Sequence, residues 1–116
     1  MFYEKEDRKD TVMSNLRGGI GDVVMRPVVT EGTLPPHYRL LNDCVMEKGC
    51  SIGMHPHEGE SEVYYILEGE ATVTDAAGTR KLQPGDAEIC FDGESHTVIN
   101  EGDEPLKMLC VIVTNA

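Results

Sequence analysis

The sequence contains no tryptophan, and phenylalanine, tyrosine and tryptophan together make up only 5% of its 116 residues. Aromatic platforms on which sugars or bases stack are therefore scarce. Basic residues are few as well, because 10 lysines and arginines stand against 21 aspartates and glutamates, and the formal net charge is −11. Phosphate backbones and anionic membrane surfaces repel such a chain, which argues against nucleic acid and membrane partners.

Long apolar runs and paired cysteines are also missing. No stretch approaches the ~20 apolar residues that a membrane span needs, and the first ten residues contain no apolar block typical of a signal peptide. The four cysteines include no C-x-x-C pair, which excludes zinc-ribbon and thioredoxin patterns. We therefore expect a cytoplasmic protein with free thiols, in which Cys44, Cys90 and Cys110 fill the core.

The chain length suits one compact domain. With 40% apolar residues, a chain of this size buries roughly two-thirds of its unfolded surface, enough for one core. Residues 1–17 are mostly polar and predict a partly ordered N-terminal arm. Gly18, Gly19 and Gly21 then interrupt the chain, so residues 18–116 are expected to form a single domain.

Short apolar runs alternate with turn-forming residues along that domain. The turns are marked by pairs such as Pro35-Pro36 and Pro84-Gly85, and no window has the 3.6-residue periodicity of a helix. Regularly spaced short strands are typical of an all-β sandwich or barrel. The expected strands lie near residues 23–29, 38–46, 50–55, 62–67, 70–75, 79–82, 87–91, 95–99 and 106–113.

Three of the four histidines belong to one pattern. His55 and His57 are two residues apart, so on a strand both imidazoles project from the same face. Glu62 follows after a segment that can turn back, and His96 begins a later apolar run. Three neutral imidazoles and a carboxylate suit a divalent first-row metal. An octahedral ion would keep two positions open for water or a bidentate ligand.

The spacing around these residues resembles the two motifs of the cupin superfamily. The similarity extends over about residues 40–113, and one departure is Phe91, where the second motif usually has proline. The first motif is matched by Gly49, His55, His57, Glu62 and Gly69, and the second by Gly85, Gly93, His96 and Asn100.

The resemblance implies a double-stranded β-helix, a jelly-roll-like barrel, with one divalent metal ion. Manganese or iron is favoured, and zinc or nickel is possible. Within the superfamily, the chain is similar to single-domain proteins that resemble one half of oxalate decarboxylase, which are often dimeric. The N-terminal arm could add a strand to a partner's sheet, so a homodimer is expected.

Other polar residues are candidates for substrate binding or catalysis. Tyr64 shares the parity of Glu62 and should point into the barrel, where it either hydrogen-bonds a substrate or packs. Arg39 and Arg26 could pair with an anionic substrate, although surface placement is the simpler expectation for both. Glu58 and Glu60 are candidates for a general acid or base, but a solvated acidic loop explains them more simply. His37 is expected at the surface or as a satisfied core residue.

Two functions fit this pattern. The first is a metal-dependent enzyme of the decarboxylase, isomerase or oxygenase type, acting on a small carboxylate or oxygenated metabolite. The alternative is a non-catalytic cupin that binds or senses a small molecule through its metal. No glutamate is evident on a flexible lid, which argues against oxalate decarboxylation, and the acid or base residue stays unassigned. A metal-free scaffold is the third possibility.

Overall fold

The computed structural model describes residues 1–30 and 32–116, which fold into two antiparallel β-sheets. Two short 3-10 helices, η1 (Lys5–Asp7) and η2 (Leu16–Gly18), lie in the N-terminal segment. The strands are β1 (Thr11–Ser14), β2 (Asp22–Pro27), β3 (Tyr38–Met46), β4 (Ser51–Pro56), β5 (Glu60–Glu68), β6 (Ala71–Asp75), β7 (Gly78–Leu82), β8 (Ala87–Cys90), β9 (Ser95–Ile99) and β10 (Leu106–Thr114).

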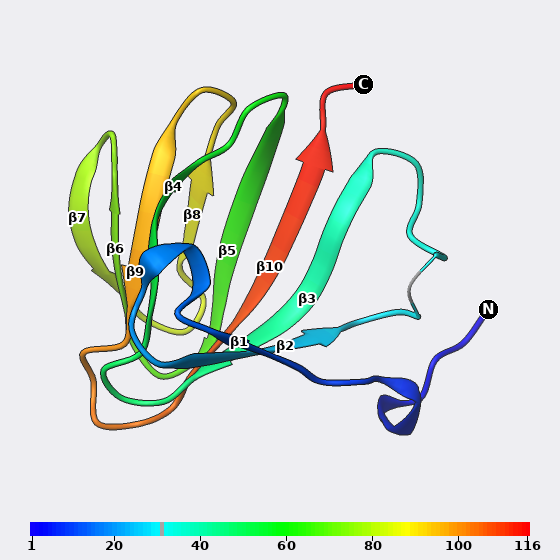
Figure 1. Ribbon diagram of the computed structural model, residues 1–116, viewed down its shortest axis with the longest axis horizontal. Coiled ribbons are helices and arrows are strands. Elements are labelled where there is room, and N and C mark those ends of the chain that lie inside the picture. Colours follow the sequence, from blue (N-terminus) through cyan, green and yellow to red (C-terminus); the bar gives the residue numbers. More distant parts are fainter. Residues whose placement is uncertain (31) are drawn as a thin grey trace.

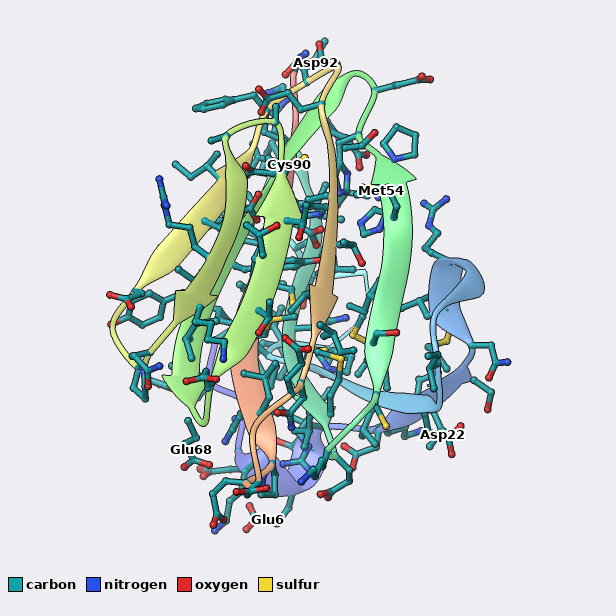
Figure 2. The ribbon with its side chains drawn as sticks, turned by 90° about the vertical axis from the view of Figure 1, so that its left-hand side faces the viewer. Glu6, Asp22, Met54, Glu68, Cys90 and Asp92 are labelled. Atoms are coloured by element: carbon teal, nitrogen blue, oxygen red, sulfur yellow. The ribbon has the colours of Figure 1, made fainter. Side chains whose placement is uncertain are left out.

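The two sheets face each other as a jelly-roll-like sandwich (Figure 1). The larger sheet has the order β1-β2-β3-β10-β5-β8, and the smaller has the order β4-β9-β6-β7. Inward-pointing side chains of both sheets fill the space between them (Figure 2). The buried core includes Met46, Ile66, Val98 and Met108. Alternating burial along β5 and β10 gives each strand one face toward this core.

The all-β prediction is confirmed. Each of the nine expected runs corresponds to one strand from β2 to β10, and the predicted ranges 38–46 and 95–99 coincide with β3 and β9. Cys44, Cys90 and Cys110 are buried, as expected. The described ranges also contain β1, a strand that the sequence pattern did not predict, and the two 3-10 turns. No helix in the described ranges is long and apolar enough to cross a membrane.

The N-terminal segment packs onto its own chain. β1 pairs with β2 at the edge of the larger sheet, with Thr11 opposite Met25 and Ser14 opposite Asp22. Arg26 on β2 donates two hydrogen bonds to Asp10, with N···O distances of 2.6 and 3.0 Å. The arm is thus held by backbone pairing and by surface charge, and β1 forms part of the sheet that surrounds the site.

Candidate metal centre

Three histidines and one glutamate converge between the two sheets. His55 lies on β4 directly opposite His96 on β9, and the register of this pair shifts between Ile52 and His55. His57 follows the end of β4, and Glu62 projects inward from β5. All four side chains are buried, with His96 fully so. Since the two imidazole-bearing strands belong to one sheet and Glu62 to the other, the fold itself assembles the cluster.

The four side chains approach one another through one set of atoms. Glu62 Oε1 lies 2.9 Å from His96 Nε2, 3.0 Å from His57 Nε2 and 3.7 Å from His55 Nε2. The Nε2 atoms of His57 and His96 are 3.1 Å apart. Ligand atoms from all four residues lie within 4.8 Å of one another. This cluster could therefore hold a metal ion.

The opposite ring nitrogens point away from the cluster, and each contacts an acceptor. His55 Nδ1 lies 2.7 Å from the Gly53 carbonyl oxygen. His57 Nδ1 lies 2.6 Å from Glu60 Oε2, and His96 Nδ1 lies 2.9 Å from Glu88 Oε1. Carbonyl and carboxylate oxygens only accept, so the Nδ1 atoms donate these hydrogen bonds. Such outer partners fix the tautomer and the orientation of metal-binding histidines.

In this arrangement, the hydrogen-bond acceptors of the histidines face those of the Glu62 carboxylate. With Nδ1 protonated, each neutral imidazole presents the lone pair of Nε2 to the Glu62 carboxylate, which also accepts. Buried acceptors without a donor are costly, at about 1–3 kcal/mol each. A cation between them, either a proton or a metal ion, removes that cost. The donor set of three imidazole nitrogens and one carboxylate oxygen fits a divalent first-row metal.

The electrostatics of Glu62 and His96 favour this charged arrangement. Burial opposes ionisation of Glu62, but its contacts with His55 and His96 outweigh burial and lower its pKa to about 2. Burial likewise opposes protonation of His96, but its hydrogen bonds to Glu62 and Glu88 raise its pKa to about 9. At neutral pH the ion-free centre therefore contains a Glu62 carboxylate and a His96 imidazolium.

Tyr64 lies beside the cluster of three histidines and Glu62. Its ring stacks on that of His96, with centroids 4.5 Å apart and planes 9° apart. Only 1% of Tyr64 is exposed, and burial followed by the charge of Glu62 raises the pKa of its hydroxyl well above 10. The side chain points into the barrel, as its parity with Glu62 predicts. It remains protonated at neutral pH, so it can donate a hydrogen bond.

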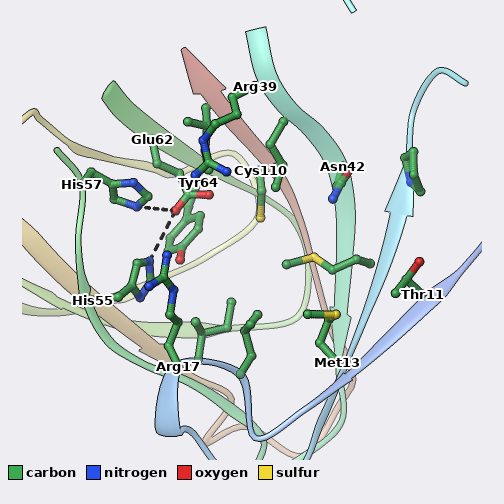
Figure 3. A pocket seen from close by; sticks show the side chains of 16 residues that line it. Thr11, Met13, Arg17, Arg39, Asn42, His55, His57, Glu62, Tyr64 and Cys110 are labelled. Atoms are coloured by element: carbon green, nitrogen blue, oxygen red, sulfur yellow. Dashed lines mark hydrogen bonds and ion pairs between the residues drawn. The ribbon is translucent and has the colours of Figure 1, made fainter. Parts of the chain in front are cut away.

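A cavity of about 380 Å³ opens beside the cluster (Figure 3). This volume is within the range of small-molecule sites. Its walls come from β1, η2, β2, β3, β4, β5 and β10 and are mostly apolar. The cavity is lined by Thr11, Met13, Leu16, Arg17, Met25, Pro27, Arg39, Leu40, Asn42, Ile52, His55, His57, Glu62, Tyr64, Cys110 and Ile112.

The other candidate residues have different positions. Arg39 lines the cavity, but its guanidinium donates to both oxygens of Glu60, at 2.6 and 2.8 Å. Glu60 begins β5 and bridges Arg39 to His57, so it does not lie in the solvated loop that the sequence suggested. Glu58 is exposed, as expected of that loop. His37 is also exposed.

Two residues near the centre were not identified from the sequence. Glu88 on β8 contacts His96, and only the register that places it opposite Tyr64 on β5 brings it to the centre. Arg17 on η2 lines the cavity from a segment expected to be an arm. Neither residue belongs to a spaced motif. The one available signal for Glu88 was its acidic character within an apolar strand.

Known proteins share both the sequence pattern and the fold. A cupin-domain family model matches residues 42–112. An oxalate-binding protein of Thermotoga maritima is 39% identical over 103 residues, covering 87% of this chain and 84% of that protein. The crystal structure of a predicted oxalate decarboxylase from Thermotoga maritima superposes with a TM-score of 0.91 at 34% identity, covering 98% and 99% of the two chains.

More distant structures share the architecture alone. KdgF from Halomonas sp. is 16% identical, with a TM-score of 0.77 over 100% of this chain and 95% of that one. The family match spans most of β3 to β10 and includes the four clustered residues. With its sandwich of two antiparallel sheets and the two motifs in place, the chain belongs to the cupin family.

Proposed function

We propose that this cupin binds a small carboxylate at one divalent metal ion held by His55, His57, Glu62 and His96. The observation that carries the proposal is the convergence of three Nε2 atoms on Glu62 Oε1 while every Nδ1 atom donates outward. A divalent ion would satisfy all of these acceptors at once, whereas one proton on His96 satisfies only part of them. A bound ion would supply positive charge and Lewis acidity at the edge of the cavity.

Manganese or iron is the favoured ion, and zinc or nickel is allowed. The mixed set of imidazole nitrogen and carboxylate oxygen is compatible with each of them, because selectivity in such sites follows geometry and metal availability as well as ligand type. Glu60 and Glu88 would orient His57 and His96 and increase the basicity of their Nε2 atoms.

A carboxylate ligand is supported by the relative and by the charges of the cavity. The relative from Thermotoga maritima is an oxalate-binding protein, which suggests a small acid as the ligand here. Glu62 is the one carboxylate that lines the cavity among the described residues, whereas two arginines line it. A net-acidic protein has no long-range attraction for anions, so a small acid must be held by these local charges.

Binding without turnover is the function that we favour over catalysis. A metal-dependent decarboxylase or isomerase needs an acid or base positioned beside the ligand and free to exchange a proton with it. Glu60 is held by Arg39 and His57, and Glu58 is exposed and does not line the cavity. The second candidate, an enzyme, is supported by Tyr64, whose protonated hydroxyl lines the cavity and could donate a hydrogen bond to an oxygen on which charge develops.

Isothermal titration of oxalate into manganese-loaded and metal-stripped protein tests the proposal. We expect saturable binding with one site per chain in the loaded protein and no detectable heat in the stripped protein. The titrated sample is then assayed for formate and carbon dioxide, the products of oxalate decarboxylation. Equal binding with and without metal would overturn the metal-dependent proposal, and product formation would favour the enzyme.

The outer contact of His57 gives a separate prediction. Glu60→Ala removes the acceptor 2.6 Å from His57 Nδ1 and is expected to weaken metal affinity by about 10- to 100-fold. Glu58→Ala, two residues earlier and exposed, is the matched control and should bind metal like the wild type. Competition against a chromophoric chelator measures both variants. Equal affinities for the two would show that Glu60 does not support the centre.

Metal binding is also expected to release a proton. The pKa of His96 in the ion-free protein is raised to about 9, so its ring is charged at pH 7 and must lose a proton before Nε2 can bind metal. About one proton per metal should leave at pH 7, and the apparent affinity should rise as pH increases toward 9. Titration calorimetry in buffers of different ionisation enthalpy measures this number, and a value near zero at pH 7 would contradict it.

We further propose that the protein is a homodimer. Val63 lies opposite both Val111 on β10 and Ile89 on β8, and exposed Tyr65 lies opposite Leu109. These residues form an apolar row on the outer face of the larger sheet, a surface type associated with protein contacts. Light scattering should give twice the chain mass of 12.8 kDa. A species of 12.8 kDa alone would contradict the dimer.

A further inference from the structure

Arg17 extends into the ligand cavity from outside the two cupin motifs. It belongs to η2, in the N-terminal segment, and it lines the same cavity as His55, Glu62 and Tyr64. In Figure 3 its side chain extends from the η2 loop toward the side of the cavity where His55 lies. The described residues place one other cation, Arg39, in the cavity wall.

The loop that carries Arg17 is fixed against β4 by close backbone contact. A Cβ atom on Gly53 would overlap the Arg17 carbonyl oxygen and lie 2.8 Å from its carbonyl carbon. A Cβ atom on Gly19 would overlap the Ser51 carbonyl oxygen. Hydrogen bonds join the same segments, because Ser51 N donates to Ile20 O at 2.8 Å and Ile20 N donates to Ser51 Oγ at 2.9 Å.

The backbone of Arg17 itself is in an unusual conformation. Its φ of 55° and ψ of 31° lie in the left-handed region, which residues other than glycine, asparagine and aspartate rarely adopt. Such strain persists only where the surrounding structure enforces it, and it is frequent at ligand sites. Here the close backbone contact between η2 and β4 enforces the left-handed conformation of Arg17. The charged side chain consequently points toward the cavity.

The two arginines of the cavity differ in their charge partners. The Arg39 guanidinium forms a two-point ion pair with Glu60. Arg17 forms no ion pair with any carboxylate in the described part of the chain. A guanidinium presents its N–H groups as a planar fork that matches two carboxylate oxygens. Of the two arginines in the cavity wall, Arg17 is therefore the one whose guanidinium N–H groups can bind an incoming acid.

We infer that Arg17 recognises the ligand of the metal centre by donating to the oxygens that face away from the metal. This inference rests on the proposed function. A two-carbon diacid such as oxalate can chelate a metal through one oxygen of each carboxylate, which leaves two distal oxygens for the guanidinium fork. Glycolate, which chelates through its hydroxyl and one carboxylate oxygen, offers one distal oxygen. Arg17 thus selects diacids over hydroxy acids.

Calorimetric titration of oxalate and of glycolate into manganese-loaded variants tests this role. Arg17→Gln removes the charge and is expected to weaken oxalate binding by about 10- to 100-fold, with a smaller loss for glycolate. Arg17→Lys retains the charge without the fork and should recover part of the oxalate affinity. Arg80→Gln, on an exposed position of β7 outside this cavity, is the control and should bind both acids like the wild type.

The outcomes separate this inference from the proposed function. If the loaded wild type binds oxalate and Arg17→Gln binds it equally well, the role of Arg17 is overturned and the proposed function stands. If the loaded wild type binds neither acid, both are overturned. Equal losses for the two acids in Arg17→Gln would indicate a collapsed pocket wall and would overturn diacid selection. Manganese content of each variant, measured in the same samples, shows that the metal centre is intact.

Discussion

His57→Ala is expected to abolish the stabilisation that a divalent metal gives to the wild type. Free metal at about a hundredfold excess over its Kd stabilises a protein by about 2.7 kcal/mol, which corresponds to roughly 10 °C in Tm for a domain of this size. The variant loses the Nε2 atom that lies 3.0 Å from Glu62 Oε1 and 3.1 Å from His96 Nε2. Its Tm should not change when manganese is added.

His37→Asn is the control for this experiment. His37 is exposed and has a φ of 71°, a left-handed conformation that asparagine tolerates. The control should show the full metal-induced shift in differential scanning calorimetry. A variant at position 57 that still gains the wild-type shift would mean that the metal binds elsewhere.

Gly53→Ala is expected to have the second-largest effect, and it acts on both the fold and the site. The added Cβ atom would meet the backbone of Arg17 and would lie 3.0 Å from Gly19 N. Backbone cannot move aside as a flexible side chain can, so we expect a loss of about 1–3 kcal/mol in the free energy of unfolding. The carbonyl oxygen that orients His55 belongs to the same residue. Metal affinity should therefore fall as well.

Urea unfolding measures this effect, with Gly102→Ala as the matched control. At Gly102 the nearest atom to a new Cβ is Asn100 Oδ1 at 3.5 Å, an ordinary contact, and φ is not in the left-handed region. The control should stay within about 0.5 kcal/mol of the wild type. Equal stability of Gly53→Ala and the wild type would show that the backbones of η2 and β4 are not in close contact.

Most of the fold was predictable because apolar runs and turn residues alternate so regularly. β1 was not predicted, because it has only four residues and its two apolar ones, Val12 and Met13, are adjacent and do not alternate with polar residues. Its formation depends on backbone pairing with β2, a partner that a local pattern does not specify. Residues 1–17 were predicted to be an N-terminal arm, and local patterns did not predict that Arg17 of this segment lines the cavity.

The cluster of four residues followed from sequence spacing, since His55, His57 and Glu62 are close in sequence and His96 completes the second motif. Their outer contacts did not follow. Glu88 reaches His96 from the other sheet, and Glu60 contacts His57 while also pairing with Arg39 on β3. Contacts of this kind depend on side-chain direction and strand register together, and neither is encoded in a local motif.

The metal content of the untagged protein, purified without chelator, tests the central claim most directly. Elemental analysis should find about one equivalent of manganese, iron, zinc or nickel in the wild type and none above background in His57→Ala. Metal-stripped wild type should again contain about one equivalent of metal per chain after incubation with the ion and desalting. A wild type that contains no metal and does not take up any would contradict the proposed metal centre and, with it, metal-dependent binding of a small acid.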